Sequence, residues 1–303
     1  MIVDLQSRSW TSAEQLGTAL ADRLRRLDAA RAVPLDASPS RLAAEMDCVS
    51  ATCLIGFRCD RIGAAIPTEF IAEAMRRHPG RVVGVAGIDP LAENPESQVL
   101  RARELGMSGL AVSPSTQGFH PTHSAAMRVF ELAERLAMPV WASRPGLITP
   151  DCRLEFDRPL AWDEGARTFP RLPIVLGGLG EPWVPEAVLL LAKHDRVFAD
   201  LAGLVGRPWQ LFEALHAASS LGVLDRLLFA SGFPHLTAAK AIEAIYSVNA
   251  FAHGTPLPSI PRAALKSIVE RDSLASLGIE FEVLPAASSA TKAPSLAAER
   301  RLV

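Results

Sequence analysis

Short apolar segments recur along the chain, and longer segments of a different periodicity separate them. Eight of these segments are rich in β-branched or small apolar residues and show little strict alternation of apolar and polar positions. Continuous apolar runs of this kind are typical of strands buried on both faces, as in a parallel sheet. The predicted strands are 1–6, 50–57, 81–89, 108–114, 139–144, 173–180, 196–203 and 226–233.

The segments between these strands place apolar residues at helical spacing. In 67–80, Phe70, Ile71, Ala74 and Met75 fall on one face of a predicted helix that stops at a Pro-Gly pair. Other segments follow the same pattern, and a last helix comes after the eighth strand. These predicted helices are 11–27, 124–138, 185–195, 207–222, 237–248 and 260–279.

About eight alternations of strand and helix predict an α/β protein, a (β/α)₈ TIM barrel, over 1–283. The main alternative is a doubly wound open sheet, which usually carries a glycine-rich phosphate loop after its first strand. Residues 6–10 contain no glycine, so the barrel is favoured. After about residue 284 the chain turns to Ala, Ser, Pro and Lys without apolar periodicity, which predicts a disordered tail over 284–303.

Composition narrows the functional classes. The 303 residues carry a formal net charge of −2, and basic residues are spread along the chain, which argues against nucleic-acid binding. There is no leader-like start and no apolar run of about 18 residues, so we expect no membrane span. The four cysteines follow no C-x-x-C spacing and are interpreted as free thiols. We therefore expect a cytoplasmic protein.

Candidate functional residues are those that follow the predicted strands, because the active sites of such barrels lie at the C-terminal ends of the strands. The candidates are Gln6, Arg8, Arg58, Cys59, Asp60, Asp89, Ser113, His120, His123, Ser143, Arg144, Gly178, Glu181, Asp200, Gly232 and His235.

Several stretches of the chain, in order, carry a resemblance to a known family. They include IVDLQSRSW at the start, HPGRVVGVAGIDP (78–90), GMSGLAVSPSTQGFHP (106–121), FPRLPIVLGGLGEPW (169–183) and LLFASGFP (227–234). From residue 1 to about 279 the chain resembles the amidohydrolase-related branch of the amidohydrolase superfamily. This branch consists of metal-dependent hydrolases and decarboxylases, among them aminocarboxymuconate-semialdehyde decarboxylase. The resemblance implies an amidohydrolase-like (β/α)₈ barrel.

The resemblance also implies where a metal ion would be held. Family members usually begin with Asp-x-His-x-His, and here Gln6 and Arg8 stand at the two histidine positions. Ser143 stands at the histidine position of the fifth strand, and Gly178 at that of the sixth. Gly232 replaces the aspartate of the eighth strand. All five expected positions are changed, although Pro182 and Trp183 of the family pattern are kept.

These substitutions do not suit a metal ion. A catalytic zinc needs about three ligands drawn from neutral His, carboxylate or thiolate. Arg8 stays cationic and has no lone pair to donate, and the two glycines have no side chain. We therefore expect no metal and no other cofactor. An H-x-x-H spacing at His120 and His123 lies in a loop with no third ligand nearby and does not change this view.

Three arginines offer a different chemistry at the same place. Arg8, Arg58 and Arg144 follow predicted strands, and a guanidinium can hold a carboxylate or phosphate with two hydrogen bonds. One hypothesis is that Arg8 and Arg144, with Arg58 and Trp183 nearby, bind an anionic small molecule. The alternative is that the arginines pair with acidic residues and fill the old cavity. The acidic residues considered are Asp60, Asp89, Glu181 and Asp200.

Two histidines are candidates for proton transfer. His120 follows the fourth predicted strand and His235 follows the eighth. Either could act as a general acid or base at the barrel mouth, the end of the barrel where the strands finish. The alternative for each is a hydrogen-bonded loop histidine without chemistry.

Three functions remain open. The first is a non-catalytic paralogue, either a regulatory or structural subunit of an active relative or a binder of an anionic small molecule. The second is a metal-independent hydrolase or decarboxylase that acts on a carboxylate-bearing substrate through Arg8, Arg144, His120 and His235. The third is an ordinary metal-dependent hydrolase, which the ligand positions argue against. The expected partners are an anionic small molecule, an active paralogue or a second copy of the chain.

Overall fold

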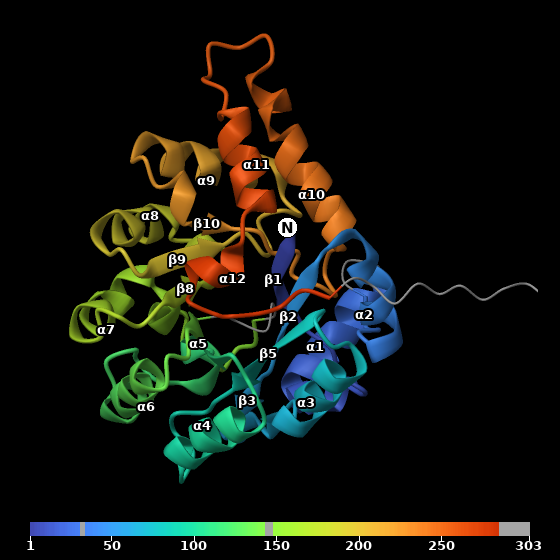
Figure 1. Ribbon diagram of the computed structural model, residues 1–303, viewed down its shortest axis with the longest axis vertical. Coiled ribbons are helices and arrows are strands. Elements are labelled where there is room, and N and C mark those ends of the chain that lie inside the picture. The colour runs from blue at the N-terminus through green and yellow to red at the C-terminus, as the bar shows by residue number, and fades with distance from the viewer. Residues whose placement is uncertain (31–33, 143–147, 285–303) are drawn as a thin grey trace, which may run out of the picture.

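Eight parallel strands form a barrel in the computed structural model (Figure 1), which describes residues 1–30, 34–142 and 148–284. Backbone hydrogen bonds from Leu5 N to Phe229 O (3.0 Å) and from Arg8 N to Phe233 O (2.9 Å) join the last strand segment to the first. The (β/α)₈ barrel predicted from the sequence is confirmed. The strands, in order around the barrel, are β1 (Val3–Ser7), β2 (Ala51–Ile55), β5 (Val82–Gly87), β6 (Gly109–Val112), β7 (Val140–Ala142), β8 (Ile174–Leu176), β9 (Val197–Asp200) and β10 (Leu227–Leu228).

Helices surround this barrel (Figure 1). Their buried apolar side chains pack on the outer face of the strands in one continuous core. The helices are α1 (Thr18–Ala29), α2 (Pro39–Glu45), α3 (Thr68–Arg77), α4 (Pro95–Glu104), α5 (Pro114–Gln117), α6 (Ser124–Arg135), α7 (Asp163–Thr168), α8 (Val184–Lys193), α9 (Pro208–Ser220), α10 (Ala238–Ser247), α11 (Arg262–Glu270) and α12 (Ser273–Ser276). None of the helices in the described ranges is long and apolar enough to cross a membrane.

Each predicted strand overlaps an observed strand, but the observed strands are shorter. One of the larger differences is at 173–180, where β8 ends at Leu176. Gly178 and Leu179 then take positive φ values of 59° and 48°, which no strand can continue. The glycines that looked like the end of a strand instead form a tight turn at the mouth.

Two predicted helices are broken, each for a local reason. The helix expected at 11–27 is interrupted at Gly17, whose φ is 83° and where an added Cβ would lie 2.5 Å from the carbonyl oxygen of Ile62. The helix expected at 260–279 ends at Glu270, and α12 begins separately. Asp272 caps α12 by accepting a hydrogen bond from Ala275 N (2.9 Å).

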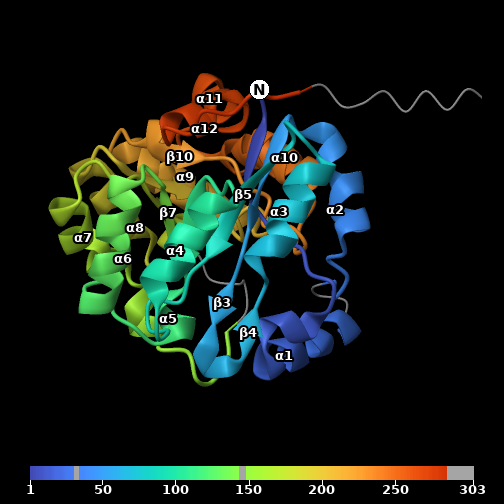
Figure 2. The ribbon, with the colours of Figure 1, turned by 60° about the horizontal axis from the view of Figure 1, so that its bottom comes forward.

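The barrel interior holds a second apolar core. Side chains from the strands, such as Leu5, Ile55 and Trp141, fill it. Leu274 and Leu277, from α12 and its C-terminal cap, pack against this core. Figure 2 shows α11 and α12 at the same end of the barrel as the N-terminus. The end of the barrel at which β1 begins is therefore covered by α12.

A small hairpin that the sequence did not predict lies at the opposite end of the barrel. β3 (Arg58–Cys59) and β4 (Ala64–Ala65) form a two-stranded antiparallel sheet directly after β2. Figure 2 shows it beside α1 and α5, opposite α11 and α12. Of the predicted tail, residues 285–303 lie outside the described residues.

Candidate functional site: a cavity on one side of the barrel mouth

A cavity of about 470 Å³ opens at the C-terminal ends of the strands. Its described lining comes from the ends of β1, β8, β9 and β10 and from the loop after β7, and we call this side of the mouth the open half. The lining residues are Gln6, Arg8, Ile148, Leu154, Gly177, Gly178, Glu181, Pro182, Trp183, Ala202, Gly203, Arg207, Gly232 and His235. The structure thus brings together Gln6, Arg8, Gly178, Gly232, Trp183 and His235, which the sequence analysis had singled out.

The end of β1 presents Gln6 and Arg8 to this cavity. Both are buried, with exposed fractions of 7% and 5%. The register between β1 and β2 shifts between Asp4 and Ser7, so the polar end of the strand leaves the regular ladder. Gly232 N donates to Gln6 O (3.0 Å), which fixes the strand end against the last loop.

Asp4 anchors the same strand end from behind the cavity. Its carboxylate accepts hydrogen bonds from the amide and hydroxyl of Ser231 (2.9 and 2.5 Å) and from the hydroxyl of Ser7 (3.0 Å). Burial raises the pKa of Asp4, and these hydrogen bonds oppose the shift. Asp4 therefore ties β1 to β10 where the barrel closes, and it is not among the residues that line the cavity.

Glycines form much of the cavity floor. Gly178, Gly203 and Gly232 all have positive φ values, of 59°, 79° and 73°. Such values favour glycine, because a Cβ crowds the backbone in the left-handed region. At Gly178 an added Cβ would also lie 2.8 Å from the carbonyl oxygen of Ala202. These positions are therefore explained by backbone geometry, and they leave the floor without side chains.

Two buried residues of opposite charge, Arg8 and Asp200, influence each other in the open half. Burial lowers the pKa of Arg8 to about 10, and the charge of Asp200 opposes this shift. Burial raises the pKa of Asp200 to about 6, against hydrogen bonds from the amides of Gly178 and Ala202 (2.9 Å each) and the charge of Arg8. The guanidinium is the group of the pair that lines the cavity.

The rim of the cavity carries a second arginine that the sequence analysis missed. Arg207 forms a two-pronged ion pair with Glu181, and this pair raises the pKa of Arg207. Trp183 and His235 lie half-buried on the same rim. Arg207 comes seven residues after the end of β9, too far along the loop for the strand-end rule to find it. Its one signal is the GRPW stretch after a glycine-containing loop.

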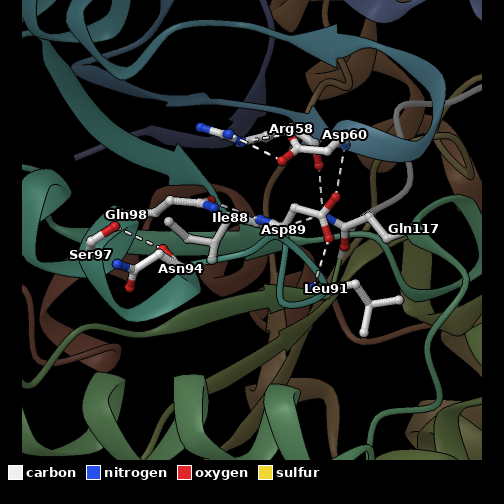
Figure 3. A network of polar contacts seen from close by, with 9 residues as sticks. All are labelled: Arg58, Asp60, Ile88, Asp89, Leu91, Asn94, Ser97, Gln98 and Gln117. Atoms are coloured by element: carbon white, nitrogen blue, oxygen red, sulfur yellow. Dashed lines mark hydrogen bonds and ion pairs between the residues drawn. The ribbon is translucent and has the colours of Figure 1, made fainter.

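On the other side of the mouth, the ends of β2, β5 and β6 and the β3–β4 hairpin form what we call the closed half. Here polar side chains hold loops together (Figure 3). Asp89 accepts hydrogen bonds from Asp60 N (2.8 Å) and Leu91 N (2.9 Å), and Asp89 N donates to Gln98 (3.1 Å). Arg58 pairs with Asp60, as the alternative interpretation of the arginines expected (2.8 Å).

Gln117 lies at the centre of the closed half. Its amide nitrogen donates to the carbonyl oxygens of Arg58 and Ile88 (2.6 Å each), and its amide oxygen accepts from Ser113 N (2.7 Å). Gln117 is 1% exposed and thus joins three strand ends. Because these residues are engaged with one another, Arg58 is not among the described residues that line the cavity.

The two histidines of the fourth loop lie on the surface. His120 is exposed, and its Nδ1 is 2.8 Å from the hydroxyl of Thr122. His123 is exposed as well and accepts a hydrogen bond from Ala125 N (3.2 Å), which caps α6. Neither is among the described residues of the cavity lining. Ser143 and Arg144, at the end of β7, lie outside the described residues.

The barrel and its mouth cavity define the architecture of a (β/α)₈ enzyme fold, and the comparisons give the family. The model of the amidohydrolase family matches residues 10–268. The chain therefore belongs to this family. A search among curated proteins finds no match.

Solved structures similar to the chain confirm the fold at low sequence identity. An uncharacterised TIM-barrel protein from Bordetella bronchiseptica has a TM-score of 0.67 and 16% identity, over 91% of this chain and 99% of its own. A probable 2-pyrone-4,6-dicarboxylic acid hydrolase from Acinetobacter baumannii, with citric acid bound, gives 0.63 and 14%, over 92% and 99%. A dihydroxybenzoic acid decarboxylase from a Polaromonas species, with manganese and 2-nitroresorcinol bound, gives 0.63 and 17%, over 91% and 96%.

The residues present at the mouth do not fit the metal ion that this family implies. Arg8 is a buried cation at one ligand position, Gln6 offers only an amide, and Gly178 and Gly232 offer no side chain. Within the described ranges, no three His, Cys, Asp or Glu side chains are grouped so that they could share a metal ion. We therefore derive no chemistry through a metal.

Proposed function

We propose that this chain binds a small carboxylate-bearing molecule at the open half of the mouth, without a metal ion. The observation that carries the proposal is the buried guanidinium of Arg8 in the wall of a 470 Å³ cavity. A guanidinium in a site shielded from water attracts an anion more strongly than an exposed one does. The glycine floor leaves room for the ligand, and Trp183 and Leu154 offer apolar surface beside it.

The test is a thermal-shift screen of the purified protein against citrate, malate, benzoate and pyruvate. We expect at least one acid to raise the melting temperature of the wild type and the shift to disappear in Arg8→Ala. Arg58→Ala is the matched control, since Arg58 pairs with Asp60 outside the cavity lining, and it should keep the shift. An unchanged shift in Arg8→Ala would show that this binding site is assigned wrongly.

A metal analysis of the same protein separates the proposal from an ordinary metal-dependent hydrolase. We expect well below one equivalent of zinc or manganese per chain, and the same binding of acids with and without a chelator. Stoichiometric metal that a chelator removes together with acid binding would contradict a metal-free site.

A second candidate is a metal-independent decarboxylase or hydrolase, favoured by His235, which lines the same cavity as Arg8. Here Arg8 would hold a carboxylate, and His235 would move a proton. The distinguishing result is turnover of a bound acid in the presence of chelator that His235→Asn abolishes while binding persists. Association with an active paralogue or with a second copy stays a prediction, which co-purification and the mass in solution would test.

A further inference from the structure

Asp200 is a buried carboxyl group directly beneath the cavity floor. It ends β9 and is 0% exposed. Its Oδ1 accepts hydrogen bonds from the amides of Gly178 and Ala202, and both of those residues line the cavity. Its Oδ2 is buried and has no hydrogen-bond partner among the described residues. A carboxylate held in this way is costly to keep ionised unless a cation faces it.

The charged surroundings of Asp200 come from β1. Arg8 faces it as the opposite charge and Asp4 as a like charge. The neighbouring strands contribute apolar groups, since Asp200 is in register with Leu228 of β10 and β8 ends in Leu176. Among the described residues, Arg8 is therefore the cation whose charge favours the ionised form of Asp200.

An anion that enters the cavity disturbs this balance. Asp200 and Asp4 are already two buried carboxyl groups near Arg8, so a ligand carboxylate bound to Arg8 adds a further negative charge beside Asp200. An arginine does not lose its proton in proteins, whereas a carboxyl can gain one. Burial has already raised the pKa of Asp200 to about 6, and a ligand carboxylate beside it would raise this pKa further, above neutral pH.

Building on the proposed anion site, we propose that Asp200 is the exchangeable counter-ion of Arg8. When Arg8 binds the carboxylate of a ligand, Asp200 takes up one proton. In this step a buffer acid loses the proton and an O–H bond forms on the Asp200 carboxyl, while no other bond changes. The site would thus take a monocarboxylate together with a proton, and it would release both when the pH rises.

The experiment measures proton uptake by titration calorimetry with benzoate and pyruvate, which are fully ionised at pH 7. Each titration is run in two buffers of different ionisation enthalpy. We expect uptake that approaches about one proton per bound ligand at pH 7, and affinity that falls about tenfold per pH unit between pH 7 and 8. Citrate is left out of this experiment because its own carboxyl groups titrate in the pH range in which Asp200 is expected to take up its proton.

Three variants assign the proton to its group. Asp200→Asn keeps the shape of the neutral acid and should bind with little proton uptake and little pH dependence. Asp89→Asn is the matched control, a buried carboxylate of the closed half, and should behave as the wild type. His235→Asn removes the histidine that lines the cavity, and this variant should keep the uptake.

The outcomes separate this inference from the proposed function. Binding by the wild type without proton uptake overturns the role of Asp200 and leaves the anion site standing. Uptake that persists in Asp200→Asn, or that disappears in His235→Asn, also overturns it. Failure of both acids and of the whole thermal-shift panel to bind overturns the proposed function and this inference with it.

Discussion

The two halves of the barrel mouth use polar groups in opposite ways. In the closed half, Gln117 and Asp89 direct their side chains at backbone groups of neighbouring strand ends. In the open half, Gly178 and Gly232 take positive φ values, and Arg8 is one of the described residues that line a cavity. At the same end of the barrel, the polar groups of the closed half are hydrogen-bonded to neighbouring groups, whereas the open half contains a cavity that can hold a ligand.

This contrast teaches where binding can be sought in a barrel whose described mouth residues do not fit a metal ion. A charged residue after a strand is informative about binding only when it borders a cavity. Arg58 and Arg8 both follow barrel strands closely. Arg58 meets Asp60 on the surface, whereas Arg8 is buried at a cavity wall. Burial and space, rather than residue type, separate a candidate site from a loop anchor.

The largest expected effect comes from breaking the closed half at Gln117. Gln117→Ala removes three buried hydrogen bonds. The carbonyl oxygens of Arg58 and Ile88 and the amide of Ser113 then lose the side chain of Gln117 as their partner. Each unsatisfied buried group costs about 1–3 kcal/mol, so we expect the free energy of unfolding to fall by about 4 kcal/mol. Urea unfolding monitored by tryptophan fluorescence would measure it.

Gln98→Ala is the control for this prediction, because Gln98 makes one such bond, to Asp89 N, and is only partly buried. We expect a loss of about 1 kcal/mol there. Equal losses for Gln98 and Gln117 would mean that the closed half is not held together mainly by Gln117.

The next effect comes from the turn of the open half. Gly178→Ala places a Cβ at a φ of 59° and 2.8 Å from the carbonyl oxygen of Ala202. The left-handed conformation and the close contact together should lower the free energy of unfolding by about 3 kcal/mol. Acid binding by the folded protein should weaken too, since Asp200 holds this turn through Gly178 N.

Gly63→Ala in the closed half is the matched control. Its φ is similar, 65°, but no atom lies within 4 Å of the added Cβ. The expected loss is therefore only the backbone cost of about 1 kcal/mol, with acid binding unchanged. Unfolding of both variants by urea, followed by the thermal-shift screen, measures the difference. A Gly63 variant as unstable as the Gly178 variant would contradict the role given to the Ala202 carbonyl.

Most of the fold could be predicted from the sequence, because hydrophobic periodicity reports burial directly. Seven of the eight barrel strands lie within the predicted segments, and β1 passes the end of its segment by one residue, Ser7. The errors occur where backbone conformation overrides pattern. The predicted sixth strand includes glycines that form a turn in the structure. The predicted helix at 11–27 includes Gly17, where the structure interrupts it. The β3–β4 hairpin has only two residues per strand, too few to show a period.

The candidate site was predictable in part. Gln6, Arg8, Gly178 and Gly232 line one cavity, as expected from their places at strand ends. Arg207 could not be found by that rule, because the long loop after β9 brings it back to the rim. The strand-end rule also cannot tell the two halves of the mouth apart. That difference depends on hydrogen bonds between segments distant in sequence, such as Gln117 and Arg58.

The smallest expected effect is that of Arg58→Ala, and it sharpens the comparison most directly. Arg58 and Asp60 are 42% and 44% exposed, so their ion pair is screened by water. Removing it should change the free energy of unfolding by less than about 0.5 kcal/mol. Urea unfolding at low and at high salt would measure this, and the two values should differ little. A loss of acid binding in Arg58→Ala would place the anion site across both halves of the mouth, because Arg58 would then act on a ligand held by Arg8.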